Sequence, residues 1–250
     1  MKRYLSTLLL LITVFFNSCA IYENIYFQED GSVKYDMSID ASEILSMTSD
    51  MNMNMADKIP TDSVIYLSDI LKDTLNITDD MKEDMINIAP LAIRMQNDVA
   101  NKKLGISLSG TFKDAEAFNK AFVSMKKLED KIKSKDDEAQ SLSQNLSIDK
   151  LYNLTSLTWD GSVMTRTVEP NKDIEPENGV DSLLKGNNPF GMFLEKGKMV
   201  VKYHFPKKIE KISNPDAVFS QDGKTAIIEY SGSIFTKPTT EFSVEITTEK

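Results

Sequence analysis

The alternate methionines of "SMTSDMNMNMADK" are the first residues here whose type and spacing could do chemistry. Met51, Met53 and Met55 occupy every second position, and thioether sulfurs are ligands that select Cu(I). A strand would place all three on one face, but the Asp and Asn residues between them are poor strand formers. On a helix, Met51 and Met55 continue the stripe of Ile44 and Met47, whereas Met53 points away. We therefore favour core packing over copper binding and predict no metal site.

The sole histidine, His204, is the next candidate for chemistry. It alternates with the apolar residues of "KMVVKYHF" and shares the polar side with Lys202, which predicts a solvent-facing side chain. A chain with one histidine and one cysteine cannot build the common zinc ligand sets. "GISLSG" (105–110) approaches the nucleophile elbow Gly-x-Ser-x-Gly, but serine replaces the last glycine and the serines alternate as in a strand. We predict no catalytic residue and no cofactor.

A third candidate is the apolar cluster in "NNPFGMFLEKG" (187–197), where bulky side chains crowd together among loop residues. One interpretation is a small cluster packed under the loop; the other is a contact patch for a protein partner or an apolar ligand. Packing is the favoured interpretation, and the contact patch stays open as the alternative. Its residues are Phe190, Met192, Phe193 and Leu194.

The only cysteine lies at the end of an N-terminal targeting segment. Residues 1–18 combine a basic start at Lys2 and Arg3 with an apolar run of 13 residues, the order of a secretory signal and too short for a membrane span. The end of this segment, "Phe16-Asn17-Ser18-Cys19", resembles the lipobox of bacterial lipoproteins. The resemblance implies cleavage before Cys19 and attachment of a diacylglyceryl group to its thiol. Two or three acyl chains give stable membrane anchoring.

Composition limits the remaining function classes. Removal of residues 1–18 leaves 250 − 18 = 232 residues, and the loss of two cations changes the net charge from −9 to −11. Such a charge argues against nucleic acid, whose phosphates need a basic surface, and against electrostatic attraction to anionic lipid. A chain of this size buries enough surface to fold without a metal or a disulfide.

Three Asp-Gly pairs predict the turns of the fold, because Asp-Gly between extended segments is a strong hairpin signal. They are Asp30-Gly31, Asp160-Gly161 and Asp222-Gly223. Between the first two pairs, the apolar period becomes helical. We expect one helix over 78–99, kinked or split by Pro90, with Met81, Met85, Ile88, Ala92, Met95 and Val99 on its apolar side, and a second after the cap Asp114, with Phe118, Phe122, Met125, Leu128 and Ile132.

Together these elements predict an α+β fold, with an antiparallel sheet of hairpins and helices packed on one face. We expect a single envelope domain over 19–250. It comprises a hairpin-helices-strand-helix half (19–135) and a mostly β half (150–250). Strand order does not follow from the sequence.

One longer stretch resembles known proteins. "YHFPKKIEKISNPDAVFSQDGKTAIIEY" (203–230) is similar to a pattern in uncharacterised lipoproteins of the Bacteroidetes type and, more distantly, in the LppM-like lipoprotein domain. The resemblance implies an α+β lipoprotein ectodomain and carries over no catalytic residue.

Two function classes follow. The favoured one is a binding or assembly module anchored to a membrane of the cell envelope by lipid, the outer membrane before the inner, with a protein partner or an apolar ligand. The alternative is an envelope hydrolase whose site is assembled from scattered residues.

Overall fold

All three predicted Asp-Gly turns close hairpins in the structure. In this computed structural model, which describes residues 20–40, 42, 61–74, 76–98, 100–101, 103–133, 155–168, 197–232 and 241–250, the turns join β1 (Ala20–Phe27) to β2 (Val33–Asp40), β6 (Thr155–Trp159) to β7 (Val163–Val168), and β10 (Val218–Phe219) to β11 (Thr225–Ser231). The glycines Gly31, Gly161 and Gly223 have φ of 84°, 95° and 70°. These left-handed conformations explain why glycine occupies each position.

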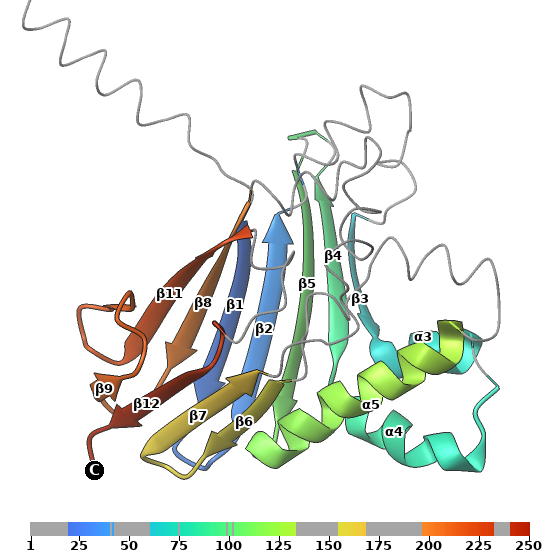
Figure 1. Cartoon of the computed structure of the whole chain (residues 1–250). Coiled ribbons are helices and arrows are strands. Elements are labelled where there is room, and N and C mark those ends of the chain that lie inside the picture. Colours follow the sequence, from blue (N-terminus) through green and yellow to red (C-terminus); the bar gives the residue numbers. More distant parts are fainter. Residues whose placement is uncertain are drawn as a thin grey trace, which may run out of the picture.

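Two sheets organise the chain (Figure 1). The larger has eight strands in the order β10-β11-β8-β1-β2-β5-β4-β3, and the smaller has four in the order β6-β7-β12-β9. The strands not yet bounded are β3 (Asp62–Tyr66), β4 (Ala92–Asp98), β5 (Lys103–Phe112), β8 (Lys198–His204), β9 (Ile209–Ile212) and β12 (Val244–Thr248). The α+β class is confirmed, although the strands form two sheets instead of the one expected.

Strand β1 lies in the middle of the larger sheet and pairs with two strands of different origin. It pairs antiparallel with β2 through the hairpin, and parallel with β8, where Ile21 is level with Met199 and Ile25 with Tyr203. The first and last parts of the chain therefore contribute to the same sheet.

The helices lie on one face of the larger sheet, as predicted (Figure 1). They are α3 (Leu67–Thr74), a short 3-10 turn (Asp79–Met81), α4 (Lys82–Ile88) and α5 (Ala115–Lys133). The predicted cap of α5 is confirmed, since the Asp114 carboxylate accepts a hydrogen bond of 2.7 Å from the Ala117 N–H. Phe118 packs against Phe112 and Tyr35 of the sheet, with ring centroids 5.4 and 5.5 Å apart.

The expected helix over 78–99 is wrong beyond Ile88. Helix α4 ends there, a turn follows at Ala89 and Pro90, and β4 begins at Ala92. Proline has no N–H to donate and restricts the residue before it, so the helix stops instead of kinking. Met95 then pairs with Ile106 of β5. In this strand Met95 shares a face with Ile93 and Asn97, and Ala92 points to the opposite face.

The smaller sheet packs on the same face of the larger sheet and is joined to it by a buried ion pair. Arg166 of β7 is 5% exposed and Glu23 of β1 is 1% exposed. The two guanidinium nitrogens donate to the Glu23 carboxylate over 2.6 and 3.2 Å. Arg166 also donates to the Tyr203 hydroxyl over 3.1 Å, and Tyr35 donates to Glu23 over the same distance. The core between the sheets therefore contains a charged network in apolar surroundings.

Candidate functional site

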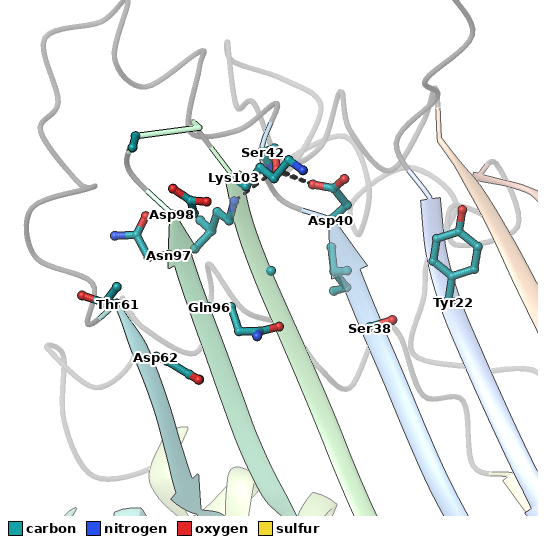
Figure 2. Close-up of a pocket in the computed structure, with 14 residues that line it drawn as sticks. Tyr22, Ser38, Asp40, Ser42, Thr61, Asp62, Gln96, Asn97, Asp98 and Lys103 are labelled. Carbon is teal, nitrogen blue, oxygen red and sulfur yellow. Dashed lines mark hydrogen bonds between the residues drawn. The ribbon is translucent and has the colours of Figure 1, made fainter.

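A hollow of about 950 Å³ lies at the end of the larger sheet where β1 begins and β2 ends (Figure 2). Much of the wall of this hollow is the outer face of the sheet. Four of its lining residues point away from the buried side of their strands: Tyr22, Ser38, Gln96 and Gly105. Loop and strand-end residues complete the rim, among them Asp40, Ser42, Thr61, Asp62, Asp98 and Lys103. Cavities of this volume are typical of small-ligand sites.

Gly105 makes room for this hollow. It is level with Asp40 on β2 and Gln96 on β4, and a Cβ added at Gly105 would meet only Gln96, at 3.9 Å. By contrast, a Cβ at Gly110 on the same strand would lie 3.1 Å from the Pro90 carbonyl oxygen and 3.0 Å from the Phe112 ring. Gly110 is required for close packing, whereas Gly105 leaves open space.

Two rim carboxylates are held ionised by their hydrogen bonds. Arg94 donates to both oxygens of Asp62 over 3.0 and 2.9 Å, and this bonding lowers the pKa of Asp62. Asn101 donates through its side chain and its backbone N–H to Asp98 over 2.7 and 3.1 Å, which lowers the pKa of Asp98. Both side chains therefore present negative charge at neutral pH.

Ser42 fixes the third carboxylate of the rim. Its hydroxyl and its backbone N–H donate to Asp40 over 2.5 and 3.0 Å, and the same hydroxyl accepts the Leu104 N–H at 3.1 Å. This contact ties the end of β2 to the start of β5 at the mouth of the hollow (Figure 2). Lys103 supplies positive charge on the same rim. Within the described ranges, no group of three or more His, Cys, Asp or Glu residues could hold a metal ion.

A second hollow, of about 620 Å³, lies at the opposite end of the sheet beside His204. His204 is on the polar side of β8, as predicted, but it is half-buried and not freely solvated. Its ring stacks on Tyr26 with centroids 4.1 Å apart. Its two ring nitrogens lie 3.1 Å from the Thr225 hydroxyl and 3.4 Å from the Asn24 side-chain oxygen. These contacts hold the imidazole against the sheet face.

We expect the imidazole of His204 to titrate below its ordinary pKa of about 6.5. Burial lowers the pKa of His204, and the positive charge of Lys202 lowers it further. Because the folded-state pKa is depressed, the unfolded chain binds this proton first, and stability falls as pH falls from about 6.5 through the folded pKa. As the chain has one histidine, its ring resonances can be followed alone by NMR.

The matched experiment compares the native chain with the chain in urea and with His204→Gln. The unfolded chain should titrate near the ordinary value, and His204→Gln should lose the part of the acid destabilisation that this ring contributes. A folded-state pKa at or above the unfolded value would contradict the burial argument.

Other residues singled out in the sequence lie outside the described ranges. They are Cys19, the methionine segment with Met51, Met53 and Met55, and the apolar cluster Phe190, Met192, Phe193 and Leu194. The lipidation of Cys19, the packing of the methionines and the contact patch therefore stay predictions. The described residues contain no helix long and apolar enough to cross a membrane.

Sequence reasoning missed both the hollow and the buried pair. Arg166 had a usable signal, since it alternates with Met164 and Val168 on the apolar side of its strand. The hollow had none, because its wall comes from strands whose order could not be derived.

The comparisons with known proteins add little. No family model matches the chain, and no curated protein matches it. Among solved structures, it is similar to the NMR structure of the folded domain of LppM from Mycobacterium tuberculosis, with a TM-score of 0.39 and 8% sequence identity over 93% of this chain and 90% of that one. The likeness is weak.

Proposed function

We propose that the protein is a binding module of the bacterial cell envelope, anchored by lipid on Cys19 and binding its ligand in the hollow at the anchor end of the larger sheet. The outer membrane is the proposed location. A contact of the apolar cluster Phe190, Met192, Phe193 and Leu194 with a protein partner or an apolar ligand is a separate proposal, which does not depend on this hollow.

One observation carries the proposal: β1 begins at Ala20, the residue directly after Cys19. Consecutive Cα atoms are about 3.8 Å apart, so an acylated Cys19 would be joined to the sheet without an intervening linker. On one side, Ala20 is level with Lys198 of β8. On the other side, Ile21 pairs with Ile39 of β2, so the next position along both strands sets Ala20 opposite Asp40, which lies on the rim of the hollow. This end of the sheet would lie next to the membrane.

The experiment for the anchor is the substitution Cys19→Ser in the full-length chain. No other thiol exists in the sequence, so we expect complete loss of radiolabelled palmitate, retention of residues 1–18 and loss of the lipid anchor. Ser18→Ala is the matched control, because it alters the adjacent residue and keeps the thiol; it should still be labelled. Label that persists in Cys19→Ser would refute lipidation at this residue.

A further inference from the structure

Carboxylates on the rim of the anchor-end hollow give it a preference for positive charge. Asp40, Asp62 and Asp98 surround its mouth, and Lys103 is the cation among the same lining residues. Arg94 already pairs with Asp62, but the bonds to Asp40 and Asp98 come from neutral serine and asparagine groups. The Asp40 carboxylate therefore has no cationic partner in these bonds, whereas the positive charge of Lys103 also acts on Asp98. The rim carries both signs of charge, with carboxylates in excess.

Apolar surface complements this charge on the wall of the hollow. Tyr22 is 38% exposed and contributes its ring from β1 on the outer face, and Ile39 and Leu104, which belong to the buried side of β2 and β5, line the hollow at the ends of those strands. A ligand that fits such a wall has a cationic end for the carboxylates, an anionic group for Lys103 and an apolar part. A free metal ion uses only the first of these features.

We propose that the hollow binds the headgroup of an amine-bearing phospholipid, with the ammonium at Asp40 and Asp98 and the phosphate toward Lys103. This inference rests on the proposed anchor, because Cys19 directly precedes Ala20 in the sequence and β1 begins at Ala20, at the end of the sheet where the hollow lies. A tethered fold meets membrane lipid at high local concentration. Ammonium-to-carboxylate hydrogen bonds are charge-assisted and strong, whereas an anionic headgroup without an amine would meet like charge at the rim.

The test uses the mature lipidated chain, purified from membranes in mild non-ionic detergent and mixed with equal amounts of phosphatidylethanolamine and phosphatidylglycerol. Native mass spectrometry then counts each lipid retained by the protein. We expect phosphatidylethanolamine to be retained about tenfold over phosphatidylglycerol, the ratio that one charge-assisted hydrogen bond supplies.

Two kinds of variant should abolish this preference. Gly105→Leu fills the hollow where the structure leaves space, and the double variant Asp40→Asn with Asp98→Asn removes the charge while leaving oxygens to accept the existing bonds. Asp216→Asn is the matched control, because it removes an exposed carboxylate that is not part of the hollow; it should keep the tenfold ratio. Melting curves of all variants show whether each is folded.

The outcomes separate the two proposals. A wild-type protein without lipid preference, or a preference that survives in folded Gly105→Leu, would overturn headgroup binding. Displacement of the lipid by an equal concentration of free O-phosphoethanolamine would overturn the membrane as the source. The same spectra give the mass of the N-terminus, so an acylated chain that retains no lipid refutes only this inference, whereas an unacylated chain refutes the anchor.

Discussion

Arg166→Ala should destabilise the protein by about 3–5 kcal/mol, because it leaves the Glu23 carboxylate buried without its cation. The Glu23 carboxylate is buried away from water. The Tyr35 hydroxyl donates to this carboxylate over 3.1 Å, but it is a neutral donor and cannot replace the guanidinium. Chemical denaturation followed by circular dichroism measures the change. An Arg166→Ala variant within about 1 kcal/mol of wild type would show that the pair is not buried as described.

A double-mutant cycle distinguishes the effect of losing the ion pair from the effect of losing side-chain volume. Glu23→Leu combined with Arg166→Met replaces both charges by apolar side chains, and we expect the double variant to be more stable than either single one, because no unpaired charge remains. Tyr203→Phe is the milder control. It removes one hydroxyl at 3.1 Å from Arg166 and should cost about 1 kcal/mol.

Phe118→Ala should cost about 3–5 kcal/mol, the usual effect of truncating a buried phenylalanine. Phe118 is 3% exposed and stands at the centre of an aromatic cluster with Tyr35, Phe112 and Phe122, with ring centroids 4.6 to 5.5 Å from its own. The cluster joins α5 to β2 and β5, so its loss should loosen the helix first. Denaturant unfolding measures the change.

Val123→Ala is the control for that substitution. It lies in the same helix but is 40% exposed, so its truncation should change stability by well under half as much. Hydrogen exchange provides a second readout, since amides of α5 should lose protection in Phe118→Ala before those of β1 and β2 do. Equal costs for the two substitutions would contradict the assignment of Phe118 to the core.

Local signals in the sequence predicted the elements that depend on neighbouring residues. The Asp-Gly turns were correct because a left-handed glycine after an aspartate acceptor is a property of four or five consecutive residues. Helix α5 was correct because its cap and apolar stripe lie within one segment. For the same reason the alternation of β8 placed Tyr203 in the core.

Features that depend on distant residues could not be predicted. Met95 fits a helical stripe and a strand equally well, and pairing with Ile106 decides between them. The hollow depends on Gly105 lying between Asp40 and Gln96, and that neighbourhood exists only once the strand order is known. The partner of Arg166 is 143 positions away in the sequence, so alternation could reveal its burial but not Glu23.

The parallel pairing of β1 with β8 also determines when the fold can be completed. Ile21 and Met199 are level in the sheet yet 199 − 21 = 178 positions apart, a separation that raises contact order and slows folding. A ribosome or a secretion channel that delivers the chain from its N-terminus would release β1 long before β8. The larger sheet then stays incomplete until β11, which ends at Ser231 in a chain of 250 residues, has emerged. If residues 1–18 act as the predicted secretory leader, the chain would still lack a complete larger sheet while that leader is engaged.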